Sequence, residues 1–508
     1  MLRFIARRLF AGLATLFVST FLMYLLVSVS IRPLDDLIES SAPNKQQLIA
    51  QRTELLDLNT PVIVRFFKWL ASFVQGDFGT AWRTGQHVNS QLGTAMVSTI
   101  QLVLAASVLA IILGVGVGII SALRQYSTFD YIITFTSFLL YSLPAFWVAV
   151  LLKQWGAIGF NDFLKDPYLS ALGIAGMAVI FGVLWMLAVG GDARRRLINF
   201  AGAAGITAAL YTYLQVSNWW LEPNINPILL AVLGAGAAVG FTLLSTGLRN
   251  RRALGAAGTT VVIGVIAYFP LQYVFYNESF NWWWLLGLAA LAAGIGILIG
   301  RLWGGPDWRQ SSRAAALTAI TMGGLTFVDQ AMLYWGDYLK MSQIRGRPIA
   351  TVGDRTPNLG GDFWISTLDT YTHLLLPTVA LMLISFAAYT RYSRASMLEV
   401  MNQDYIRTAR AKGLTERTVV MRHAFRNSLI PLATIVPMDL VAVFGGAIIT
   451  EQVFGRPGMG QLFVKSLSMA EIDPVMAYLV VTAALAVLAN IVADLIYAAL
   501  DPRIRVNS

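Results

Sequence analysis

The side chains that most often carry out chemistry are few and scattered in this chain of 508 residues. It contains no Cys and three His, which are His87, His373 and His423. Disulfides, thiolate metal sites and thiol catalysis are therefore excluded, and the histidines lie too far apart for a ligand spacing such as HExxH. The sequence also lacks a GxxxxGK[ST] phosphate loop. We expect a protein that is not an enzyme, with no ATPase site, metal or cofactor of its own.

One strongly basic stretch lies between two apolar runs, DYIRTARAKGLTERTVVMRHAFRNSLIP at 404–431, which we call the basic block. It holds five Arg and one Lys against one Asp and one Glu. Gly413 fits the position after a helix C-terminus that needs a positive φ. Thr415 fits the N-cap of a second helix, with Glu416 in its first turn, and Pro431 fits the start of the next apolar span. The second helix offers an apolar docking face made of Val419, Val420, Ala424 and Leu429.

A basic loop could do no more than fix the orientation of a membrane protein. Two or three charges are enough for that purpose. The basic block has more order, because its pattern predicts a helix, a glycine turn and a second helix. We therefore interpret it as a docking element.

The elements that carry the block are membrane helices. The chain is 56% hydrophobic and 13% charged, whereas about a quarter of the residues of a soluble protein are charged. Repeated apolar runs of 18 or more residues predict an all-α polytopic membrane protein. The twelve expected spans are 9–30, 97–123, 132–156, 168–190, 198–219, 226–247, 253–275, 281–303, 314–335, 373–391, 432–453 and 476–499.

The net charge of +10 follows this topology. With a cytoplasmic N-terminus, the dense Arg clusters and the basic block all fall on the cytoplasmic side, as the positive-inside rule requires. Both termini are then cytoplasmic, and nucleic acid is not needed to explain the charge. Two long segments fall outside: 31–96, with an amphipathic helix and a glycine turn, and the Gly- and Pro-rich loop 336–372.

Several separated motifs resemble one family. TARAKG, followed 18 residues after its glycine by Pro431, is similar to the EAA loop of importer-type ABC permeases. Within those permeases the block resembles the dipeptide/oligopeptide family, B-type subunit. Further matching stretches keep the family order and are RFIARRL, FVQGDFGTAWRTG, SLPAFW at 142–147, ITEQVFGRPGMGQL at 449–462 and ADLIYAALDPRIR at 493–505.

The resemblance covers about residues 1–160 and 360–508 and implies a core of six spans. The other six spans then form an inserted helical bundle at 168–336, which is a departure from the family pattern. We expect an N-terminal half of the permease core at 1–167, the insertion at 168–336, and a C-terminal half of the core at 337–508. The C-terminal half includes the coupling loop at 392–431.

In such permeases the EAA loop docks in a cleft of a separate ATPase subunit, which binds ATP and Mg. The resemblance assigns this coupling role to Asp404, Arg407, Thr408, Ala409, Lys412, Gly413 and Leu414. The Glu-Ala-Ala triplet corresponds here to Arg407-Thr408-Ala409, so the family Glu is absent.

Four acidic residues and one glycine outside the block are also expected to have roles. We expect Asp439 either on the translocation path or in a hydrogen bond to a neighbouring helix or to the second permease subunit. Glu451 and Gly458 are expected in a structural turn near the outer gate. Asp494 is expected to be structural, and Asp329 to be solvated at the outer end of its span.

The implied function is that of a permease subunit of an ATP-driven ABC importer for peptides in the cytoplasmic membrane of a prokaryote. Its expected partners are a second permease, two ATPase subunits or one fused ATPase, an extracytoplasmic substrate-binding protein and membrane lipid. Nickel chelates, glutathione and oligosaccharides are alternative substrates. A twelve-span secondary transporter is a less favoured alternative, because no six-span repeat is recognisable.

Overall fold

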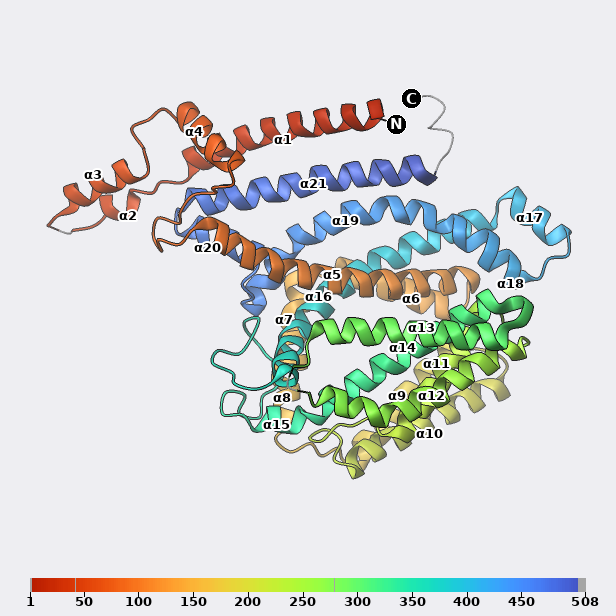
Figure 1. Ribbon diagram of the computed structural model, residues 1–508. Coiled ribbons are helices and arrows are strands. Elements are labelled where there is room, and N and C mark those ends of the chain that lie inside the picture. The colour runs from red at the N-terminus through yellow and green to blue at the C-terminus, as the bar shows by residue number, and fades with distance from the viewer. Residues whose placement is uncertain (1, 42, 278, 501–508) are drawn as a thin grey trace.

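In a lipid environment the backbone must satisfy its hydrogen bonds internally, which favours helices. The computed structural model describes residues 2–41, 43–277 and 279–500, so the end of the C-terminal motif, 501–505, lies outside the described residues. Within these ranges the β contacts amount to one isolated bridge between Thr80 and His87. The long helices lie side by side (Figure 1). The expected all-α class is confirmed.

The helices vary widely in length. The long ones are α1 (Leu2–Ser30), α5 (Val88–Leu123), α6 (Thr128–Ser142), α9 (Ala171–Val189), α10 (Ala193–Val216), α11 (Pro227–Ser245), α12 (Arg251–Phe275), α13 (Trp282–Gly304), α14 (Trp308–Leu333), α16 (Phe363–Met401), α19 (Phe425–Phe454) and α21 (Ile472–Leu500). The short ones are α2 (Asp35–Ile38), α3 (Lys45–Leu55), α4 (Val62–Val74), α7 (Ala145–Leu151), η1 (Leu152–Gly159), α8 (Phe160–Phe163), η2 (Gly305–Asp307), α15 (Trp335–Lys340), α17 (Asp404–Ala411), α18 (Glu416–Thr418), η3 (Val419–Ala424) and α20 (Met459–Ser468).

Among the described residues, ten helices are long and apolar enough to cross a membrane, or eleven when a bent pair counts as one span. One of the ten, the segment Trp282–Lys340, contains both α13 and α14. These two helices are antiparallel neighbours, because Gly296 packs against Ala316 and Gly300 packs against Ser312. With the bent pair counted as one span and α13 and α14 counted separately, the described part of the chain has twelve spans.

The centre of the core is the pair α5 and α16, which pack along much of their lengths. They approach closely at Gly118, where a Cβ would overlap Ser393 and lie 2.5 Å from the Thr390 carbonyl oxygen. Helix α19 packs on α16 and α21, and α1 packs on α21. Helix α16 is much longer than the expected span 373–391. Its end opposite α17, on the side of the molecule that we call outer, begins where Asp362 accepts hydrogen bonds from two backbone N–H groups.

The third core span is broken, which corrects the expected continuous span at 132–156. Helices α6 and α7 meet at an angle of 103° across Leu143 and Pro144. Leu143 has extended backbone angles, φ −76° and ψ 131°. Proline disfavours helical geometry in the residue before it, and its own ring fixes φ, so the chain turns within SLPAFW.

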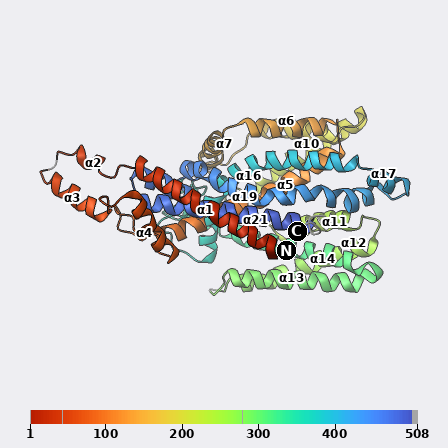
Figure 2. The same ribbon diagram turned by 90° about the horizontal axis from the view of Figure 1, so that it is seen from above.

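The outer segment between α1 and α5 contains the amphipathic helix that its sequence predicts. Phe66 and Trp69 of α4 are buried against Tyr24 of α1. A turn follows, with Gly76 at φ +87° and Gly79 at φ +89°. Viewed from above, α2, α3 and α4 project at the end of the molecule opposite α17 (Figure 2).

The six helices of the region expected to be inserted pack in two groups. Helices α9 and α10 pack on each other, and α9 also packs on α6. Helices α11, α12, α13 and α14 pack together as a four-helix unit, which we call the middle bundle. The split has a physical basis in α10, whose side chains are nowhere buried and therefore suit contact with lipid.

The expectation that Asp329 is solvated is wrong. Its side chain is 1% exposed inside the middle bundle. One oxygen accepts a hydrogen bond from the Ile225 N–H at 2.6 Å, and the other accepts one from the Tyr268 hydroxyl at 2.8 Å. The carboxylate therefore joins α14 to α12 and to the segment before α11.

Candidate functional site

The first half of the basic block folds as its turn residues predict. Helix α17 ends at Ala411 with Lys412 as its C-cap, and Gly413 follows with φ +73°. The Thr415 hydroxyl then accepts a hydrogen bond from the Thr418 N–H and caps α18. Helix α17 protrudes at one end of the molecule (Figure 1). Residues 404–424, which comprise α17, the Gly413 turn, α18 and η3, are therefore ordered rather than an irregular loop. We call these residues the elbow.

The inner face of the elbow is packed on the chain's own core. Ile406 and Ala409 of α17 are buried in a cluster with Val419, Val420 and Ala424. The core contributes to this cluster from two helices, with Ile119 and Ala122 on α5 and Met397 on α16. The apolar face therefore contacts α5 and α16. Ala409, which we expected in the coupling surface, faces the core.

The opposite face of the elbow is exposed. Its exposed members from the expected coupling set are Asp404, Arg407, Thr408, Lys412, Gly413 and Leu414. Arg407 lies 3.5 Å from Asp404 within the helix, in the position of the missing family Glu. Arg410 binds Glu416 across the turn with N–O distances of 2.7 and 3.1 Å, and this hydrogen bonding raises the pKa of Arg410.

The second half of the basic block corrects the expectation for Pro431. The chain passes from α18 through the π-helix η3 directly into α19, and Pro431 and Pro437 lie inside that helix. The Thr434 hydroxyl donates to the Pro431 carbonyl at 2.7 Å. Proline is tolerated inside membrane helices where neighbouring groups satisfy the freed backbone atoms. Helix α19 therefore begins at Phe425, before Pro431.

A buried ion pair near the elbow was missed at the level of sequence. Asp130, at the start of α6, accepts hydrogen bonds from Arg394 on α16 at 2.7 and 2.9 Å. It also accepts from the Ser121 hydroxyl at 2.5 Å and from the Tyr126 N–H at 3.0 Å. Both residues lie just outside the expected spans, Asp130 before 132–156 and Arg394 after 373–391, so a charge at the end of each span was the available signal. The pair ties α5, α6 and α16 together close to the elbow.

A turn is present where one was expected around Glu451 and Gly458, and Glu451 is at its centre. The carboxylate is fully buried and accepts hydrogen bonds from the N–H groups of Gly460 and Gln461 at 2.8 and 3.1 Å. It also accepts a 2.6 Å bond from the Thr99 hydroxyl of α5. Gly458 packs so closely that any side chain there would overlap this carboxylate. Glu451 thus joins α19, α20 and α5.

Arg456 in the same turn was not singled out from the sequence. Its side chain is 1% exposed, and its Nη2 donates to Gln101 at 3.4 Å. Burial lowers the pKa of Arg456. Within the described residues, its Nε and Nη1 atoms have no hydrogen-bond partner. The sequence signal for Arg456 was its position between the glycines of GRPGMG, within a stretch that resembles the permease family.

The two remaining acidic candidates each have a partner. Asp439 is half-buried on α19, and its carboxylate forms a hydrogen bond with Tyr389 of α16. This contact matches the second of the two roles considered for Asp439. Asp494 on α21 lies 3.1 Å from Arg8 on α1. The expectation of a structural role for Asp494 agrees with that contact.

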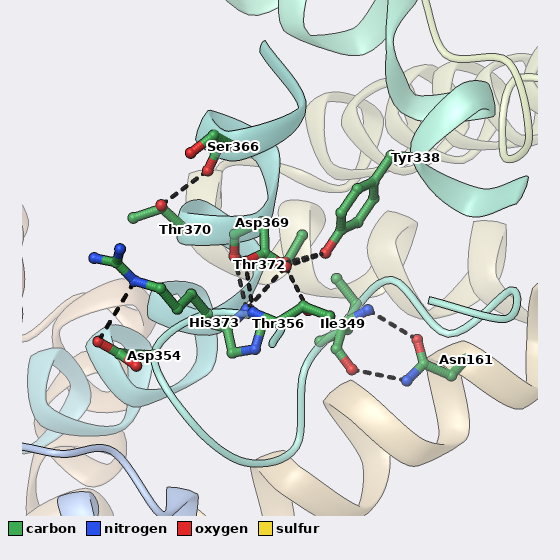
Figure 3. A network of polar contacts seen from close by, with 11 residues as sticks. Asn161, Tyr338, Ile349, Asp354, Thr356, Ser366, Asp369, Thr370, Thr372 and His373 are labelled. Carbon is green, nitrogen blue, oxygen red and sulfur yellow. Dashed lines mark hydrogen bonds and ion pairs between the residues drawn. The ribbon is translucent and has the colours of Figure 1, made fainter. Parts of the chain in front are cut away.

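A polar network closes the outer end of α16 (Figure 3). Asp369 accepts hydrogen bonds from the Tyr338 hydroxyl at 3.0 Å and from the Thr356 hydroxyl at 2.6 Å. Tyr338 also contacts the Thr372 hydroxyl at 3.1 Å. The amide of Asn161 bonds both the N–H and the carbonyl of Ile349. The outer loop, α15 and α8 are therefore held against the core.

Among the described residues, no group of three or more His, Asp or Glu side chains could hold a metal ion. The fold and the elbow define the class as a polytopic helical membrane permease. The sequence matches the family described as binding-protein-dependent transport system inner membrane component over residues 259–506, and the chain belongs to this family.

Named relatives of the chain are permease proteins, in agreement with this family assignment. The chain is 26% identical to the oligopeptide transport system permease protein OppB of Mycobacterium tuberculosis over 507 residues, which cover 100% of both chains. It is 32% identical to the dipeptide transport system permease protein DppB of Escherichia coli over 240 residues, covering 43% of this chain and 69% of the relative. It is 46% identical to the oligopeptide transport system permease protein AppB of Bacillus subtilis over 136 residues, covering 27% and 43%.

Proposed function

We propose that this chain is the membrane permease subunit of an ATP-driven importer that carries peptides across the cytoplasmic membrane by alternating access. The oligopeptide and dipeptide names of the relatives support the substrate class. The same machinery for nickel chelates, glutathione or oligosaccharides remains the alternative. Binding assays on the purified substrate-binding partner, with a peptide library and these solutes, discriminate between the two.

The single observation that carries the coupling role is the two-sided elbow. The exposed face of the elbow presents Arg407 and Lys412 to a partner, while Ile406 and Val419 anchor the elbow to the core. A rigid element fixed to α5 and α16 can transmit the motion of a docked ATPase to the helices that switch access. We assign ATP and Mg to that separate subunit.

We further propose the orientation and the partners. The starts of α10, α12 and α14 carry Arg clusters at the end of the molecule where α17 lies, which supports a cytoplasmic location for that end and for both termini. The complete importer then contains a second permease, two ATPase domains and an extracytoplasmic substrate-binding protein. Residues 168–336 form the additional region between the two halves of the permease core, 1–167 and 337–508.

Gly413→Val tests the coupling role. Valine disfavours the φ of +73° that the elbow requires, although there is open space for its side chain. In proteoliposomes containing the complete importer, we expect the number of peptides moved per ATP to fall about tenfold, which corresponds to about 1.4 kcal/mol of lost coupling. Membrane insertion should be unchanged.

Gly76→Val is the matched control, since Gly76 also has a positive φ and open space but lies on the outer segment. It should retain the wild-type ratio of transport to ATP hydrolysis. A Gly413→Val importer with that same ratio would contradict the coupling role of the elbow.

A further inference from the structure

A cleft of about 780 Å³ separates the basic block from the middle bundle. Its apolar wall comes from the ends of three spans, with Leu123 on α5, Leu244 on α11 and Leu398 on α16. Its polar wall includes Tyr126, Asn402 and Arg417. Because these spans end at the cleft, it lies at the level where a membrane meets water. An apolar wall beside a polar wall at that level suits an amphipathic occupant.

The contact between the middle bundle and the core is dense at the outer end. There Trp364 of α16 lies among Phe275, Phe280, Phe327 and Tyr334, and its Nε1 donates to the Phe275 carbonyl at 3.0 Å. At the end where the cleft lies, one polar side-chain contact links the block to the bundle among the described residues, from Arg417 to the Leu243 carbonyl. The middle bundle and the core therefore pack tightly at the outer end and are separated by the cleft at the other end.

Arg417 is the cation best placed to bind a ligand in the cleft. Arg410, the other cation of the lining, is held by Glu416 in a bidentate pair. No ion pair involves Arg417 within the described ranges, and its guanidinium has five N–H donors. One of these groups contacts the carbonyl of Leu243 near the C-terminus of α11, where the helix dipole favours a cation. The remaining donors are available to an anionic group.

We propose that this cleft binds an anionic glycerophospholipid, with its phosphate at Arg417 and an acyl chain along Leu123, Leu244 and Leu398. The volume lies in the range of about 300–1,000 Å³ that is usual for ligand sites. Basic pockets between membrane helices on the cytoplasmic side are a known setting for anionic lipid headgroups. The leaflet assignment rests on the cytoplasmic orientation proposed above.

A lipid in this position would contact the block and the bundle at once. It would bridge Arg417 on the block and Leu244 on α11, which are otherwise joined through the Leu243 carbonyl. The lipid would therefore limit the movement of the elbow relative to the middle bundle. This gives the middle helices a specific role in the importer, as one wall of a lipid site.

The test uses the complete importer purified from membranes and examined by native mass spectrometry for retained phosphatidylglycerol. Arg417→Gln removes the phosphate-binding charge, and Leu244→Trp fills the apolar wall while leaving Arg417 in place. Arg422→Gln is the matched control, since Arg422 is an exposed Arg of the same block outside the cleft lining. We expect retained phosphatidylglycerol to fall at least fivefold in both cleft variants and to stay unchanged in the control.

Equal lipid retention in all four proteins would overturn the proposal. So would an equal loss in the Arg422→Gln control, because charge alone would then explain binding. Wild-type importer in vesicles of phosphatidylcholine should regain the bound species when phosphatidylglycerol is added, and retention of phosphatidylcholine at the same level would also contradict the anionic class. These readouts do not depend on peptide transport, so a failure of the proposed substrate would leave them intact.

Discussion

At the scale of single residues, buried charges hold the ends of the core helices in place. Burying a carboxylate is costly unless hydrogen bonds compensate. Glu451 receives three donors, two of them from the N-terminus of α20, where a helix favours negative charge. Asp130 is compensated by Arg394 and Ser121 in the same way. Both carboxylates join helices that are distant in sequence, so they stabilise the tertiary structure.

Glu451→Gln should weaken the outer turn. One carboxylate oxygen accepts from both N–H groups and the other accepts from the Thr99 hydroxyl, whereas the amide has a single acceptor oxygen, so its N–H₂ group faces a donor and leaves buried groups unpaired at a cost of about 1–3 kcal/mol. We expect a lower melting temperature in detergent and faster amide hydrogen exchange at Gly460 and Gln461. Glu399→Gln, at an exposed position of α16, is the control and should change neither quantity. Unchanged exchange at Gly460 in Glu451→Gln would show that the carboxylate does not cap α20.

At the scale of elements, α16 is the connection between the outer network and the elbow. Its 39 residues correspond to about 58 Å at 1.5 Å per residue. Asp369 near one end is bonded to Tyr338 and Thr356, while Met397 near the other end is buried against the elbow. Helix α5 packs along α16 and stiffens it. Motion imposed on the elbow therefore has a direct route to the outer loop.

Gly118→Ala tests the seam between α5 and α16. The added Cβ would overlap Ser393 and crowd the Thr390 carbonyl, so we expect a loss of about 1–3 kcal/mol from overpacking. Gly116→Ala is an internal control two residues away on α5, where nothing lies within 4 Å of the added atom. Chemical denaturation in mixed micelles should give a lower midpoint for the first variant and an equal or higher midpoint for the second. Equal midpoints would show that the seam tolerates separation.

At the scale of the whole molecule, the sequence predicted what depends on local pattern. The long apolar runs gave the helical class and the spans, because a lipid-exposed backbone must be helical. Gly413 and Thr415 took the turn and cap roles expected from their chemistry. The helix breaks at Pro144 but continues through Pro431. Because the residue is proline in both places, the neighbouring groups decide between the two outcomes.

What the sequence could not predict depends on contacts between distant segments. Asp130 and Arg394 are 264 positions apart, and Arg417 and Leu243 are 174 apart. Mean hydropathy is highest in α9 and lowest in α10 among the middle helices, so it did not reveal that these two pack together as a hairpin. Asp329 was misjudged because its partners Tyr268 and Ile225 lie on other segments. Placement within a helical membrane protein thus depends on side-chain partners that periodicity does not identify.

The attachment of the middle bundle to the core leads to a final prediction, centred on Trp364. This side chain is 2% exposed among aromatic rings of α12 and α14, so Trp364→Ala should cost about 3–5 kcal/mol through lost packing and a cavity. We expect hydrogen exchange to rise at the outer ends of α12 and α14. Trp283→Ala removes a Trp that is 80% exposed on α13 and should leave exchange unchanged.

The same pair of variants separates anchoring from general instability. Met397 and Ile406 are buried at the other end of α16, in a cluster that shares no residue with the one around Trp364. If Trp364 anchors the bundle, exchange at the elbow should stay close to wild type in Trp364→Ala. Equal increases at both ends would mean that the whole core had loosened, and equal exchange in the two Trp variants would mean that the bundle is held elsewhere. The expected pattern, loss of protection confined to the outer junction, follows from a bundle that is packed onto the core at that end and separated from the elbow by a cleft at the other.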